Sequence, residues 1–132
     1  MTQANNVAIE SSQINSSGVL QVAGGGTGFA LTTNSTTTGA TITPSITAPQ
    51  YEVTALASAA TFAIPSAGYD GQKLIIRIKD NGTAQALTWT TTSGGYRAEG
   101  VTLPTTTVAS TPLYVGCIYN SQDTYWDVVA VS

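Results

Sequence analysis

Residues 71–90 read GQKLIIRIKDNGTAQALTWT, and this stretch decides the predicted fold. Its first half alternates apolar with basic side chains: Leu74, Ile76 and Ile78 with Lys73, Arg77 and Lys79. A period of two is the pattern of a β-strand with one buried face. Asn81-Gly82 follows, and these residues tolerate the positive φ angles that a type I′ turn requires. The stretch therefore predicts a β-hairpin.

A two-residue loop at Asn81-Gly82 also sets the register of this hairpin. Ile76 then lies opposite Leu87, on the second strand. Leu74 lies opposite Trp89. A slip of one residue would turn Leu87 and Trp89 toward the basic side, so the register is well specified. We expect the basic side to be a solvated sheet face, with a binding patch as the alternative.

The composition restricts the class of protein. Charged residues make up 8% of the 132 residues, against about 25% in an ordinary globular domain. Ser, Thr and Gly are abundant, which is typical of rigid β-rich extracellular or virion proteins. The net charge of −3 argues against nucleic-acid binding, which needs a clustered positive field. No apolar run is long enough for membrane insertion, and no secretion signal is recognisable.

The residue types also argue against catalysis. The chain contains no histidine, so the usual general base and the usual zinc ligand are missing. Asp70, Asp80 and Asp123 fall in predicted turns, where Asp caps backbone groups. We therefore expect a protein that is not an enzyme, with no catalytic residue, no cofactor and no metal site. Cys117, the single cysteine, lies in an apolar run and is expected to be a small buried residue.

The chain is expected to have two parts. Residues 51–132 carry short strand patterns separated by turn signals, among them a closing hairpin formed by residues 113–119 and 124–131. No stretch shows helical periodicity. The predicted fold class is all-β, with an antiparallel β-sandwich or jelly-roll-like C-terminal knob domain. An extended N-terminal arm, residues 1–50, precedes it.

The N-terminal arm holds too little apolar surface for a core of its own. Residues 32–47 are rich in Thr, which favours extended backbone, and Pro44 and Pro49 disfavour a central strand. We expect an anchor or short shaft that gains order by association, with a disordered linker as the alternative. The glycine-rich stretch 24–28 lacks the Lys-Ser/Thr of a phosphate-binding loop, so a bend or close chain packing explains it better.

The closing hairpin is apolar on both of its faces, although a sandwich strand needs only one buried face. The surplus predicts a subunit contact formed by Tyr114, Ile118, Tyr125 and Val129. A central strand buried on both sides is the alternative. Aromatic residues could also stack on sugar rings at one end of the domain: Tyr96, Tyr114, Tyr119, Tyr125 and Trp126. The alternative places the tryptophans in the core and the tyrosines at the rim of a subunit contact.

Two stretches of the C-terminal part resemble a known family. These are DGQKLIIRIKDNGTAQALTW at residues 70–89 and LPTTTVASTPLYVGCIYNSQDTYWDVVAVS at residues 103–132. They resemble the small C-terminal β-domain of many tailed-phage fibre and other virion surface proteins. Upstream, VLQVAGGGTG is similar to a glycine-rich motif that recurs in the shafts of phage tail fibres. Its proposed anchor and assembly residues are Val19, Leu20, Val22, Gly24, Gly25, Gly26, Thr27 and Gly28.

The resemblance implies a non-enzymatic homotrimer on the surface of a phage particle, assembled in the host cytoplasm. Its N-terminal segment would attach to another virion protein, of the tail or of the capsid. One alternative is a capsid cement or decoration protein at three-fold positions of the head. A further alternative is a receptor tip that binds a host surface glycan. The chain has almost no shaft, which distinguishes it from long fibres and leaves capsid attachment open.

Overall fold

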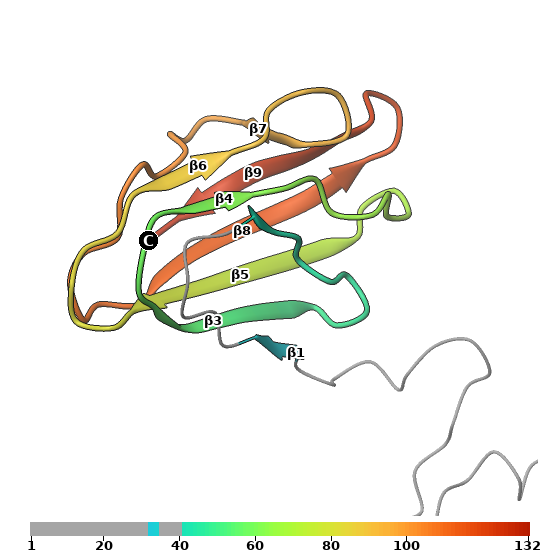
Figure 1. The fold of residues 1–132 in the computed structure, drawn as a ribbon. Helices are drawn as coiled ribbons and strands as arrows, with labels where there is room; N and C mark the ends of the chain where they lie inside the picture. Colours follow the sequence, from blue (N-terminus) through green and yellow to red (C-terminus); the bar gives the residue numbers. More distant parts are fainter. Residues whose placement is uncertain (1–31, 35–40) are drawn as a thin grey trace, which may run out of the picture. The chain divides into compact units, whose positions relative to one another are not determined.

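The computed structural model describes residues 32–34 and 41–132. In this part of the chain the regular elements are nine β-strands, and there is no helix. The strands form a six-stranded sheet of order β1-β3-β5-β8-β9-β7 and a three-stranded sheet of order β2-β4-β6 (Figure 1). The predicted all-β class is confirmed.

The strands of the larger sheet are β1 (Thr32–Asn34), β3 (Gln50–Leu56), β5 (Lys73–Asp80), β7 (Tyr96–Ala98), β8 (Leu113–Asn120) and β9 (Tyr125–Val131). Those of the smaller sheet are β2 (Thr41–Ile42), β4 (Ala60–Phe62) and β6 (Leu87–Trp89). Only the pairs β5–β8 and β8–β9 are antiparallel, and the other five pairs are parallel. The predicted antiparallel arrangement is therefore wrong for most of the strand pairs.

Four of the five parallel pairs, those formed among β1 to β6, result from the path of the chain. From β1 to β7, successive strands alternate between the two sheets. After each strand the chain crosses to the other sheet, forms one strand there and then returns. A crossover of this kind makes the two neighbouring strands parallel. β7, β8 and β9 follow one another in the larger sheet, and of these successive strands only β8 and β9 pair directly, as the predicted closing hairpin.

The predicted hairpin of residues 71–90 does not form. β5 pairs with β3 and β8, whereas β6 pairs with β4 in the other sheet. Gly82 does have positive φ, 106°, but the chain beyond it does not return along β5 and contacts the buried carboxylate of Asp80. This carboxylate accepts hydrogen bonds from the Gly82 amide, the Ser110 amide and the Thr107 hydroxyl, at 3.0, 2.8 and 2.6 Å.

The prediction of which side chains on these two strands point into the core is nevertheless correct. Leu74, Ile76 and Ile78 are fully buried, while Lys73 and Lys79 are exposed. Leu87 and Trp89 are also buried, although they reach the core from the smaller sheet. Alternation along each strand thus determined which side chains enter the core, independently of the strand to which each is paired.

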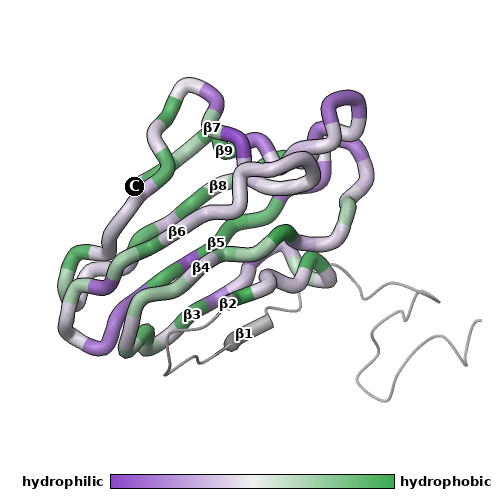
Figure 2. Tube along the Cα trace, turned by 45° about the horizontal axis from the view of Figure 1, so that its top comes forward, coloured by the Kyte–Doolittle hydropathy of each residue, from purple (hydrophilic) through white to green (hydrophobic). Residues whose placement is uncertain are grey.

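Side chains of both sheets form a single hydrophobic cluster. Phe62 stacks on Trp89 with ring centroids 4.4 Å apart, and the edge of Tyr96 meets Trp89 at 4.9 Å. The Trp89 indole N–H donates to the Pro104 carbonyl at 2.7 Å. Each large side chain buried here contributes about 1.5–3 kcal/mol. Figure 2 shows hydrophobic residues along the strands and hydrophilic residues in the turns that join them.

The proposed boundary at residue 50 stays a prediction. β1 and β2 precede it, and they pair in parallel with β3 and β4. The Ile42 side chain is buried in the common core. The proposed anchor residues, between Val19 and Gly28, lie outside the residues that the structure describes.

Candidate functional site

The candidate site is the outward face of the six-stranded sheet, the face turned away from the core. An apolar band crosses its middle over β5, β8 and β9. Ile75, Tyr114 and Val129 keep 41%, 39% and 45% of their surfaces exposed. Gly116 lies between Ile75 and Ala130 in the register, so no side chain covers the band at that point. Exposed apolar groups that gather on one face are typical of interaction surfaces.

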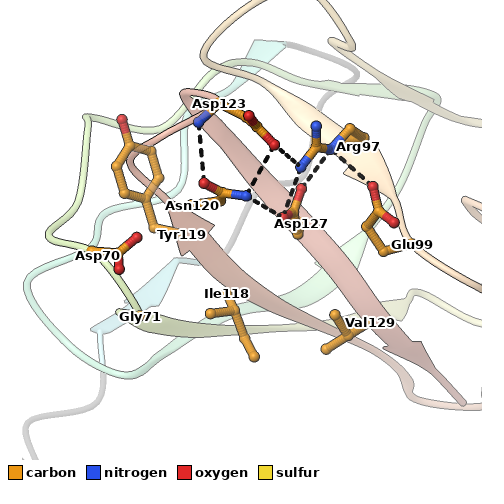
Figure 3. A pocket seen from close by; sticks show the side chains of 10 residues that line it. All are labelled: Asp70, Gly71, Arg97, Glu99, Ile118, Tyr119, Asn120, Asp123, Asp127 and Val129. Atoms are coloured by element: carbon orange, nitrogen blue, oxygen red, sulfur yellow. Dashed lines mark hydrogen bonds and ion pairs between the residues drawn. The ribbon is translucent and has the colours of Figure 1, made fainter.

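An open hollow of about 590 Å³ lies on the β8, β9 and β7 side of this band. We name it the acidic hollow because its lining carries four carboxylates and a single guanidinium. Its charged and polar lining residues are Asp70, Arg97, Glu99, Asn120, Asp123 and Asp127 (Figure 3).

Arg97 is the centre of the acidic hollow. Its Nε and one terminal nitrogen donate to the two oxygens of Asp127 at 2.7 and 3.0 Å. The terminal nitrogen also donates to Asp123 at 3.0 Å, and Nε lies 3.0 Å from a Glu99 oxygen. The bond to Asp127 is bidentate, the arrangement that suits a planar guanidinium. The guanidinium carbon also lies 5.0 Å from the centre of the Tyr125 ring.

These contacts hold the charges of the acidic hollow in place. Hydrogen bonds from Arg97 to Asp127 and then to Asp123 raise the pKa of Arg97 above its usual range. The Asn120 amide bridges the same two carboxylates, at 3.3 and 3.2 Å. The ion pair between Arg97 on β7 and Asp127 on β9 therefore adds to the backbone pairing of these two strands. The surplus of carboxylates leaves the hollow negative.

A second, smaller hollow of about 240 Å³ opens on the β3 and β5 side of the same face. Its lining residues are Val53, Thr54, Arg77, Lys79, Pro112 and Tyr114. We name it the basic hollow because its lining contains two cations and no carboxylate. Arg77 donates at 2.7 Å to the buried carboxylate of Glu52, which also accepts from Gln50 at 2.6 Å. Lys79 is exposed.

The predicted subunit-contact residues lie on or beside this outward face. Tyr114 and Val129 are exposed, while Ile118 and Tyr125 are half-buried. Tyr114 lines the basic hollow, and Ile118 and Val129 line the acidic one. Whether they contact another subunit stays a prediction.

The aromatic residues considered for sugar stacking are divided by the fold. Tyr96, Tyr119 and Trp126 are buried, at 0%, 5% and 0% exposure, although Tyr119 also belongs to the lining of the acidic hollow. Burial of the Trp126 and Trp89 side chains agrees with the alternative that assigned both tryptophans to the core. Of the five aromatic residues considered, only Tyr114 and Tyr125 retain appreciable exposure.

The described residues contain no group of three or more His, Cys, Asp or Glu placed to hold a metal ion. Cys117 is buried, and burial raises the pKa of its thiol to about 12. Within the described ranges we also find no helix of the length and apolar character needed to cross a membrane.

Sequence reasoning missed the two hollows. Arg97 and Asp127 are thirty residues apart, and they meet only because β7 pairs in parallel with β9. The available signal was that Arg97 is the one basic residue outside the 73–79 segment. Comparison with protein families, with curated proteins and with solved structures finds no match for this chain.

Proposed function

We propose that this chain is a non-enzymatic structural component of a tailed-phage virion. It forms a short homotrimeric fibre, attached to the tail or the head through its N-terminal segment. The proposal rests on the resemblance of residues 70–89 and 103–132 to virion β-domains, together with the glycine-rich motif at 24–28. We further propose that the two sheets are the layers of a β-sandwich, with a jelly-roll-like character.

The observation that supports a subunit role most is the outward face of the six-stranded sheet. Ile75 and Val129 are 41% and 45% exposed on the same face, and apolar groups that gather on one face favour association. Only 8% of the residues are charged, which agrees with a structural protein. Among the described residues, Arg97 pairs with Glu99, Asp123 and Asp127, and Arg77 pairs with Glu52, whereas Lys73 and Lys79 are exposed.

Light scattering on the purified full-length chain tests the assembly. The mass expected for the homotrimer is three times 13.5 kDa. A stable monomer at micromolar concentration would contradict the proposal. Attachment is tested separately by deleting residues 2–30. The shortened chain should keep its β-domain, as followed by circular dichroism, and should no longer bind virus particles. Binding that survives the deletion would show that the anchor lies elsewhere.

A capsid cement protein at three-fold positions of the head is the second candidate. The resemblance also supports it, because the β-domain that residues 70–89 and 103–132 resemble occurs in virion surface proteins other than fibres. The two candidates differ in where the protein lies on the particle. Density for the domain on the faces of the head would support cement, and density on the tail would support a fibre. A glycan-binding tip has less support, since three of its five candidate rings are buried.

A further inference from the structure

We infer that the outward face of the six-stranded sheet is a head-to-tail contact between copies of this chain, in which the basic hollow of one copy packs against the acidic hollow of the next. The inference rests on the proposed homotrimer and specifies which surfaces of the subunits meet. Its occupant is a second copy of the same chain.

Charge complementarity is the first argument. The basic hollow lies over β3 and β5 and carries Lys79, which is exposed, beside Arg77, which is paired with Glu52. The acidic hollow lies over β8, β9 and β7 and carries four carboxylates around Arg97. The two hollows therefore occupy opposite sides of one sheet face, in the strand order β3-β5-β8-β9-β7. Complementary potentials of this kind steer association and determine which patches meet.

The apolar band between the hollows is the second argument. Ile75 and Val129 are both more than two-fifths exposed, and Gly116 leaves the sheet bare beside them. Subunit contacts commonly have an apolar centre and a polar rim. Here the band would form the centre, and the two charged hollows would form the rim on either side.

The symmetry follows from the separation of the hollows. A contact between two different patches is heterologous, and it generates a closed ring when the rotation between copies closes. With three sheet faces turned toward a common axis, the β3 side of each copy meets the β7 side of its neighbour. Within one copy the two patches cannot touch. Lys79 is six residues along β5 from Lys73, or roughly 20 Å, and Lys73 lies in register with Ile118 and, through it, Asp127.

Zero-length cross-linking tests the contact directly on the full-length chain. A carbodiimide joins a lysine to a carboxylate only when the two are in contact. Mixing nitrogen-14 and nitrogen-15 chains before cross-linking separates bonds between copies from bonds within one copy. We expect heavy–light peptides that join Lys79 to the acidic hollow, where the side chains of Glu99 and Asp123 are 50% and 53% exposed. Lys73 is the internal control, since in the register it lies two strands from Asp127 of its own chain, so a bond between these two should join peptides of one copy.

Charge reversal tests the energetics. Lys79→Glu and Glu99→Lys each place like charges opposite each other, and each should raise the concentration of half-dissociation by roughly tenfold. The double variant restores opposite charges and should recover most of the loss. Thr88→Glu is the matched control, because Thr88 is exposed on β6 in the other sheet. It should leave the mass unchanged.

The possible outcomes separate this inference from the proposed function. Heavy–light peptides at Lys79, together with rescue in the double variant, support the contact. If the protein is a trimer but yields no such peptide, or if neither charge reversal changes its dissociation, the proposed contact is refuted and the proposed trimer is not. A monomer at micromolar concentration overturns both. A mass of two copies refutes the three-fold ring.

Discussion

Replacement of Gly95 by Ala should displace β7 and loosen the acidic hollow. Gly95 precedes β7, and its own amide donates to the Thr92 carbonyl at 2.8 Å. A Cβ at this position would lie 2.1 Å from the Thr90 carbonyl oxygen and 2.9 Å from that of Thr92. Ordinary contact begins near 3.4 Å. Both obstacles are backbone atoms, so no side chain can rotate to relieve the clash.

The expected loss in the free energy of unfolding follows from the backbone hydrogen bonds that the added Cβ weakens. The Tyr96 amide donates to the same Thr90 oxygen at 2.9 Å, so moving that oxygen away weakens this bond and the one to Thr92. Two hydrogen bonds contribute about 2 kcal/mol net. Overpacking adds about 1–3 kcal/mol. The free energy of unfolding should therefore fall by about 3–5 kcal/mol. With an m value of about 1.5 kcal/mol per M, the urea midpoint falls by about 2–3 M.

Gly100→Ala is the matched control, since the substitution is the same but the environment differs. Gly100 has φ of 73° and no atom within 4 Å of an added Cβ. Its cost is therefore the backbone preference alone, about 1–2 kcal/mol. Both variants should be unfolded in urea at the same protein concentration, because association contributes to apparent stability. If Gly95→Ala destabilises no more than Gly100→Ala, the steric reasoning is refuted.

Three further predictions concern buried polar groups. Hydrogen bonds, first of all from the Thr107 hydroxyl, lower the pKa of Asp80 below its usual 3.8. The charged carboxylate therefore stabilises the folded state above that pH. This contribution is lost as the pH falls through the lowered pKa. Urea midpoints of Asp80→Asn and wild type should therefore differ near neutral pH and converge on acidification; a constant difference would contradict this. Trp89→Phe removes the hydrogen bond to Pro104 and should cost about 2–3 kcal/mol in urea unfolding, whereas a cost below about 1 kcal/mol would refute it. The Cys117 thiol, whose pKa burial raises to about 12, should resist alkylation at about pH 8 in the folded chain and react once it is unfolded; rapid labelling of the folded chain would refute its burial.

The alternation of apolar and polar residues along a strand was sufficient to predict which of its side chains point into the core. Leu74, Ile76 and Ile78 were assigned to one buried face, and all three are buried. The closing hairpin was also predictable, because its two strands are adjacent in sequence and joined by a short polar turn. Both results depend on local information, namely the period of a strand and the residues of a turn.

The partners of most strands were decided by tertiary structure alone. Asn81-Gly82 has the turn chemistry of a hairpin, yet β5 and β6 lie in different sheets. Beyond β5 the Asp80 carboxylate accepts hydrogen bonds from Thr107 and Ser110, contacts that no local pattern encodes. The Arg97–Asp127 ion pair likewise exists only because β7 is aligned with β9. The sequence by itself determined which side chains of residues 73–79 and 87–89 are buried, since burial there follows from a period of two. The pairing of strands depends on where a crossover returns, and only packing of the complete domain decides that.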